Sequence, residues 1–176
     1  MNRKKKVARN IFILIILSII IFTRVLYLTP IAAHEASERS LHYGPSKVVH
    51  VEDFDGGKFI LSKYDKWISC DTVNRSKSFF WYFGSRKTVE NEQNKPLDYG
   101  WGMDDRYGTM LYGVINDDRI SKVELQLEGG STLSQTDFYD GDMFLFIWEN
   151  DFTQIWLNSI KAYDALGNLI LEEEIK

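Results

Sequence analysis

The side chains in this sequence with the widest range of chemistry are three histidines, His34, His42 and His50. Two of them could meet if a short helix folded over the first strand of the chain. A metal site would also need carboxylates aimed at the same point, and the spacing matches no known ligand pattern. No His-Glu-x-x-His motif is present either. The sequence therefore predicts no metal site, and we interpret the histidines as ordinary surface or core residues.

Acidic side chains gather in several turns, and the densest group is Asp137, Asp140 and Asp142. Calcium prefers clustered oxygen ligands, so these three carboxylates could supply part of a site. Their spacing does not match an EF-hand loop, however, and Asp and Gly are also the residues that a hairpin turn favours for local reasons. We interpret the group as turn chemistry.

The chain is poorly equipped for nucleophilic catalysis. Its one cysteine, Cys70, lies in a strand-like segment, and its expected role is that of a small buried residue. The sequence contains neither a G-x-S-x-G elbow nor a phosphate-binding glycine loop. Carboxylate pairs are easy to find among 25 acidic residues, so they identify no glycosidase site without geometry. We predict no catalytic residue and no cofactor, which leaves the enzyme class open and favours a non-enzyme.

The most unusual feature is an aromatic run, FFWYF, at residues 79–83. In a strand, Trp81 would point to one side and Tyr82 to the other. One face could form an exposed platform for sugar rings or an apolar partner, and Tyr99 and Trp101, in a glycine-flanked segment, could join it. The alternative, which the usual burial of aromatic residues favours, is a strand buried on both faces. The candidate binding residues are Trp81, Tyr82, Tyr99 and Trp101.

The elements that would position these residues are mostly strands. After Ser46 the sequence reads as about ten short strand-like runs separated by turn residues, with one short helix before them. In residues 121–128 apolar and polar residues alternate, which is typical of a sheet with one wet side. Residues 143–148 are apolar on both faces and are predicted to be a central strand, whereas the polar residues 84–96 are predicted to be a surface loop.

This pattern predicts a mainly β protein with an antiparallel β-sandwich-like domain and one short N-terminal helix, preceded by a single transmembrane helix. The alternative arrangement is a twisted sheet with the short helix lying across it. We find no internal repeat and no low-complexity tract in the sequence.

The N-terminal part predicts how the chain is placed in the cell. Residues 1–10 are basic and are interpreted as a cytoplasmic tail, and residues 11–28 are almost entirely apolar and are predicted to be a transmembrane anchor. Residues 29–45 would be a short helix and linker, and residues 46–176 a β-rich extracytoplasmic domain. The expected location is the cell membrane, single-pass. The alternatives are a cleaved signal peptide, which would leave a secreted domain, and a buried core helix.

Charge is divided unevenly along the chain. Residues 1–24 contain six basic residues and no acidic one, whereas the remainder has 15 basic and 25 acidic residues, a net formal charge of −10. An acidic domain repels phosphate backbones, so no nucleic acid is expected as a partner. A cationic partner or surface fits better, and the alternative is that the charge only keeps the domain soluble.

Six short phrases mark the turns and strands of the chain: TPIAA at 29–33, VEDFDGG at 51–57, YDKWIS at 64–69, YGVI at 112–115, FIWE at 146–149 and AYDALGN at 162–168. Their order resembles a group of small, uncharacterised membrane-anchored or secreted proteins of Bacillus-like bacteria. The similarity covers most of residues 29–170. It implies a Gram-positive envelope setting and carries over no catalytic or binding residue.

Together these features favour a non-enzymatic binding or interaction domain of the cell envelope. Its expected partners are membrane lipid, through residues 11–28, and an envelope protein or wall polymer. One alternative is a cell-wall-acting hydrolase that uses paired carboxylates, which would need two acids facing each other in a cleft. Another is a structural envelope protein with no tight ligand.

Overall fold

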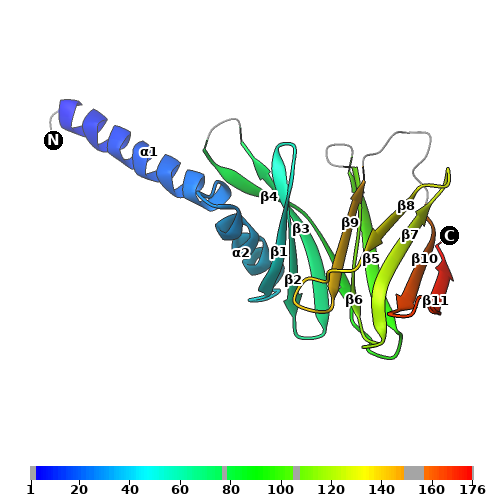
Figure 1. The fold of residues 1–176 in the computed structure, drawn as a ribbon. Helices are drawn as coiled ribbons and strands as arrows, with labels where there is room; N and C mark the ends of the chain where they lie inside the picture. The colour runs from blue at the N-terminus through cyan, green and yellow to red at the C-terminus, as the bar shows by residue number, and fades with distance from the viewer. Residues whose placement is uncertain (1–2, 77–78, 105–107, 149–156, 176) are drawn as a thin grey trace.

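The computed structural model describes residues 3–76, 79–104, 108–148 and 157–175, which contain two α-helices and eleven β-strands (Figure 1). Helix α1 runs over Arg3–Val25 and helix α2 over Pro30–Leu41. The Thr29 hydroxyl caps α2 by accepting a hydrogen bond from the Ala32 N–H at 3.1 Å. The β-rich fold that the sequence predicts is confirmed.

The strands form three antiparallel sheets. The first sheet has the order β1-β2-β3-β4, with β1 at Lys47–Phe54, β2 at Gly57–Tyr64, β3 at Trp67–Arg75 and β4 at Trp81–Glu90. The middle sheet has the order β5-β6-β9, with β5 at Leu97–Asp104, β6 at Gly108–Ile115 and β9 at Met143–Trp148. The third sheet has the order β11-β10-β7-β8, with β7 at Ile120–Leu127, β8 at Thr132–Gln135, β10 at Leu157–Asp164 and β11 at Leu169–Glu174.

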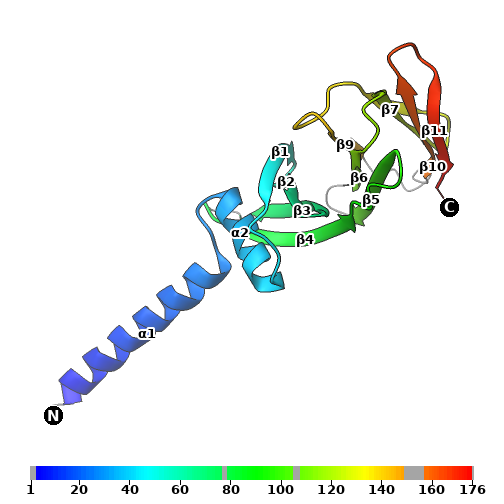
Figure 2. The same ribbon diagram turned by 90° about the horizontal axis from the view of Figure 1, so that it is seen from below.

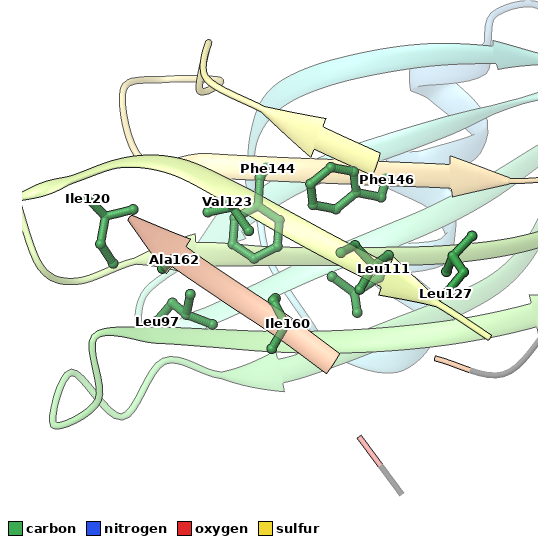
Figure 3. Close-up of a cluster of buried hydrophobic side chains, with 10 residues drawn as sticks. Leu97, Leu111, Ile120, Val123, Leu127, Phe144, Phe146, Ile160 and Ala162 are labelled. Atoms are coloured by element: carbon green, nitrogen blue, oxygen red, sulfur yellow. The ribbon is translucent and has the colours of Figure 1, made fainter. Parts of the chain in front are cut away.

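Two apolar cores hold the sheets together as stacked layers. The first core joins Phe59 and Leu61 of the first sheet to Tyr112 and Leu145 of the middle sheet. The second core joins the opposite face of the middle sheet to the third sheet, and it includes Leu97, Leu111, Val123, Phe144, Phe146 and Ile160 (Figure 3). Figure 1 shows the middle sheet between the other two. Helix α2 covers the outer face of the first sheet, where Ala33 packs on Ile60 and Val73.

The predicted antiparallel β-sandwich-like domain has one layer more than a sandwich of two sheets, because the middle sheet packs against another sheet on each of its two faces. Successive side chains of β6 and β9 point alternately into the first and the second core. The apolar pattern of residues 143–148 reports this burial of both faces. The pattern does not show the position of the strand within its sheet. The predicted central strand is in fact β9, an edge strand of the middle sheet.

The predicted loop at residues 84–96 is also wrong in its first half, because β4 continues to Glu90. Among the strands of the described residues β4 pairs with β3 alone, apart from an isolated bridge at Trp81, and so forms an edge of the first sheet. Polar side chains are frequent on edge strands, where they prevent pairing with other chains. A run of polar residues in the sequence therefore does not by itself distinguish a loop from an edge strand.

The predicted transmembrane helix at residues 11–28 is wrong as well. α1 ends at Val25, and Tyr27 instead pairs its backbone with Trp81 through two N–H···O hydrogen bonds of 2.7 Å. The uncharged helical stretch at 11–23 spans about 20 Å, which is short of a hydrocarbon core of roughly 30 Å. Neither helix in the described part of the chain is long and apolar enough to cross a membrane. Figures 1 and 2 show α1 extending away from the stacked layers in both views.

Candidate functional site

β9 presents a backbone edge that its own sheet does not use. The Ile115 N–H donates to the Asp142 carbonyl, which fixes the alternation of the ladder between β6 and β9. The backbone groups of Met143, Leu145 and Ile147 therefore point away from β6. Within the described ranges, the outward N–H and C=O of Ile147 have no backbone partner.

The rest of this edge is capped locally. Tyr139 donates its N–H to the Met143 carbonyl at 2.7 Å and accepts from the Met143 N–H at 2.9 Å. The Leu145 N–H donates to the side-chain oxygen of Gln135 at 3.1 Å. A side-chain cap can rotate away, whereas a backbone pair cannot leave without moving the chain. The edge from Leu145 to Ile147 is thus the part that could accept another strand.

Two adjoining hollows follow this edge, and we call them together the edge groove. One, of about 320 Å³, is lined by Glu52, Asp53, Tyr139, Leu145 and Ile147. The other, of about 410 Å³, is lined by Ser134, Gln135, Thr136, Asp137, Tyr139, Leu145 and Phe146. The two share Tyr139 and Leu145, and the described residues that line them include three carboxylates and no basic side chain. The groove therefore combines an apolar floor with acidic walls.

The wall formed by residues 137–142 is fastened to the first sheet by ion pairs. The Lys47 ammonium lies 2.7 Å from an Asp140 oxygen, and Lys63 bonds to Asp142 and lies 3.6 Å from Asp140. These lysines hold the pKa of the Asp140 carboxyl below its usual value, with the Lys47 hydrogen bond as the largest cause. Two of the three carboxylates considered for calcium are thus paired with lysine. No group of three metal-ligating side chains gathers in the described part of the chain.

Tyr139 stands at the junction of the two hollows. The His50 ring stacks on it, with ring centres 3.7 Å apart and an angle of 11° between the planes. The His50 Nε2 atom lies 2.9 Å from a Glu52 oxygen. Partial burial raises the pKa of the Tyr139 hydroxyl. This stack fixes the orientation of the side chain that divides the edge groove.

A second polar cluster lies buried between α2 and the first sheet. The Arg86 Nε atom donates to Asp71 Oδ1 at 2.7 Å, and Arg86 Nη2 bonds to Asp71 Oδ2. The same Oδ2 atom lies 2.7 Å from His34 Nδ1. The Asp71 side chain is 2% exposed and that of His34 is 1% exposed. Buried charges require partners of this kind, so the cluster fastens α2 to β3 and β4.

The outer side of His34 faces the N-terminal end of β1. Its Nε2 atom lies 3.2 Å from the Ser46 hydroxyl and 3.3 Å from a Glu38 oxygen. A pocket of about 660 Å³ opens here between α2 and residues 42–48. Gly44 is needed beside it, because its φ is +97° and a Cβ atom would lie 2.8 Å from the Glu38 carboxyl group.

The order Asp71, His34, Ser46 has the carboxylate–imidazole–hydroxyl connectivity of serine hydrolases. Two contacts of Glu38 argue against that activity. Its oxygen competes with Ser46 for His34 Nε2, and it accepts the Ser46 N–H at 3.0 Å, so this N–H is not available to stabilise an oxyanion. We therefore interpret the cluster as a structural ion network. The sequence predicted His34 to be an ordinary surface or core residue, and that prediction did not include its bonds to Asp71 and Glu38.

The predicted binding residues are divided between different faces. Trp81 is half-buried and packs beside Tyr27 on the cluster beneath α2, with the Arg75 guanidinium 5.9 Å from its ring centre. Tyr82 is half-buried opposite Asn74 in the ladder of the first sheet. Because neighbouring strand residues alternate, Tyr82 points to the opposite side from Trp81.

Tyr99 and Trp101 lie on the middle sheet, on the face toward the third sheet. Tyr99 packs against the second core, and burial together with the Glu173 carboxylate raises its pKa to about 12. Trp101 is 48% exposed. The structure thus brings Tyr99 and Trp101 to one face and places Trp81 in a different cluster. Cys70 is fully buried in the first core, which raises the pKa of its thiol.

Sequence reasoning missed the residues that form the edge groove and the ion network. Gln135 and Tyr139 are ordinary loop and strand-end residues in sequence, and only strand pairing brings them to β9. Asp71 carried a signal, because it is the one charged residue in the strand-like run from Trp67 to Val73. A charged residue in such a run predicts a buried partner.

No family model, no curated protein and no solved structure matches this chain. The resemblance of residues 29–170 to small envelope proteins of Bacillus-like bacteria therefore stays a prediction.

Proposed function

We propose that this protein is a non-enzymatic interaction domain that binds an extended, basic peptide segment along the edge groove. The observation that carries the proposal is the outward-facing backbone edge of β9 between Leu145 and Ile147, set in a groove with acidic walls. An exposed strand edge is a template for one more strand, and several classes of recognition domain use it in this way.

The bound segment would form its main-chain hydrogen bonds with Ile147, and with Leu145 once the Gln135 side chain rotates away. In an added strand alternate side chains point to one face, so successive residues would enter the two hollows in turn. Glu52 and Asp137 lie at these hollows, and Asp53 lies beside Glu52, already bonded to Lys58. Basic side chains on the segment would meet the carboxylate of Asp137 and that of Glu52, which also contacts His50.

The first test uses a short synthetic peptide that alternates lysine and valine, and a matched peptide with glutamate in place of lysine. We expect the lysine peptide to bind the full-length protein in a calorimetric titration and the glutamate peptide not to bind. Backbone amide signals of Leu145 and Ile147 should shift in NMR spectra on addition of the lysine peptide. Equal binding of both peptides would contradict the proposal.

Ile147→Pro tests the backbone contact directly. The Ile147 N–H points away from β6, so proline removes the outward donor without removing a bond of the ladder. We expect Ile147→Pro to lose peptide binding at least tenfold with an unchanged circular dichroism spectrum, whereas Ile147→Val keeps it. A folded Ile147→Pro protein that binds the lysine peptide as tightly as the parent would contradict the proposal.

The charged walls provide an independent test if the proline variant does not fold. Glu52 and Asp137 are on the surface, so the double change Glu52→Gln with Asp137→Asn should leave the fold intact. We expect it to weaken binding of the lysine peptide several-fold and to reduce the salt dependence of that binding. A matched change at Asp117→Asn, outside the groove, should have no effect on binding.

A further inference from the structure

The apolar side chains of α1 between Val7 and Ile20 are exposed around the helix. Ten of them between Val7 and Ile20 have 40–63% of their surface accessible. Contiguous exposed apolar surface of this size marks a site where something else binds. It is independent of the edge groove, which lies on the far side of the first sheet from α2.

Apolar side chains are also exposed at the base of the helix. The backbone pair between Tyr27 and Trp81 holds residues 26–28 next to the segment that enters β4. Two strongly exposed apolar side chains lie in these neighbouring segments, Leu28 at 75% and Phe79 at 81%. A single extended partner could therefore contact α1 and the domain at the same time.

The charge of α1 identifies the chemistry of that partner. Arg3, Lys4, Lys5, Lys6 and Arg9 are exposed on the same helix, and residues 1–24 contain no acid. The partner must therefore offer apolar material beside negative charge. A second copy of α1 would offer apolar side chains but would add basic residues and no negative charge. A lipid surface with anionic headgroups supplies both apolar material and negative charge.

We infer that α1 and its base seat on an anionic lipid surface. The basic residues contact lipid phosphates, and the apolar side chains of α1, with Leu28 and Phe79, enter the boundary between headgroups and acyl chains. The net charge of −10 on the rest of the chain repels the same surface, so the domain is held off it with the edge groove accessible.

The test is sedimentation of the full-length protein with vesicles of phosphatidylcholine alone or mixed with phosphatidylglycerol. We expect binding to the mixed vesicles that is at least tenfold stronger than binding to phosphatidylcholine and that falls as salt is added. Lys4→Glu, Lys5→Glu and Lys6→Glu combined should lower binding more than tenfold. Lys95→Glu, an exposed loop lysine, serves as the matched control and should leave binding unchanged.

Phe79→Ser tests the base of the helix, and it should weaken vesicle binding several-fold without changing peptide binding at the edge groove. Binding that is equal on both vesicle types, or unaffected by the three glutamates, would overturn the inference. Self-assembly of the protein without vesicles would also overturn the inference if Phe79→Ser and the three glutamates left that assembly unchanged. In that case α1 would be covered by other copies of the chain.

Discussion

Asp71 is a buried carboxylate with both oxygens bonded, to Arg86 and to His34. In Asp71→Asn the Arg86 guanidinium, with 5% of its side chain exposed, would remain in the interior without a counter-charge. Breaking a buried pair in this way costs about 3–5 kcal/mol. We therefore expect the free energy of unfolding, measured by urea titration, to fall by about this amount.

Asp53→Asn is the matched control, because the Asp53 side chain is 78% exposed and also bonds to a lysine, Lys58. Exposed pairs contribute about 0–1 kcal/mol, so this variant should unfold almost as the parent does. If Asp71→Asn were as stable as Asp53→Asn, the buried network could not be what fastens α2 to the first sheet.

Tyr99 makes the stability of the domain depend on pH in the alkaline range. Burial first, and then the Glu173 charge and hydrogen bond, raise its pKa from 10.0 to about 12. Between these values the unfolded chain releases the proton and the folded one keeps it, so the stability from this group is complete below about pH 10 and is lost as pH rises through about 12.

Tyr99→Phe removes this contribution. Burial also raises the pKa of Tyr112, so some alkaline destabilisation should remain in the variant. We expect the urea midpoint of the parent to fall more steeply between about pH 9 and pH 11.5 than that of Tyr99→Phe. Parallel curves for the two proteins would show that Tyr99 ionises normally in the folded state.

At the scale of elements, strands were predictable wherever one local pattern decided them. Residues 121–128 alternate apolar and polar side chains, and β7 follows that alternation with Val123 and Leu125 buried. The turn at Asp55 and Gly56 joins β1 to β2, with Phe54 opposite Gly57. Each of these features needs information from fewer than ten or so neighbouring residues.

Elements were mispredicted where pairing between distant segments decided the outcome. The apolar run of residues 11–28 continues past Val25 in sequence, but the pairing of Tyr27 with Trp81 ends the helix. The apolar run of β9 showed two buried faces and could not show which edges were paired. The edge groove could not be predicted for the same reason, since Glu52, Tyr139 and Leu145 meet only where the first sheet packs beside β9 of the middle sheet.

At the scale of the whole molecule, the middle sheet couples both cores. Tyr112 of β6 fills the first core, and Phe144 of the adjacent strand β9 fills the second. Neither outer sheet can keep its apolar face buried if the middle sheet unfolds. The edge groove depends on this stacking, because its walls come from the first and third sheets and its floor from the middle one.

This coupling predicts that the three sheets unfold in one transition. Phe59→Ala, in the first core, and Ile160→Ala, in the second, should each lower the free energy of unfolding by about 2–5 kcal/mol. Because each loss is transmitted through the middle sheet, tryptophan fluorescence and circular dichroism should give the same urea midpoint in both variants. If Ile160→Ala instead gave two separate midpoints, the third sheet would be an independent unit, and the edge groove would lose one wall before the domain unfolds.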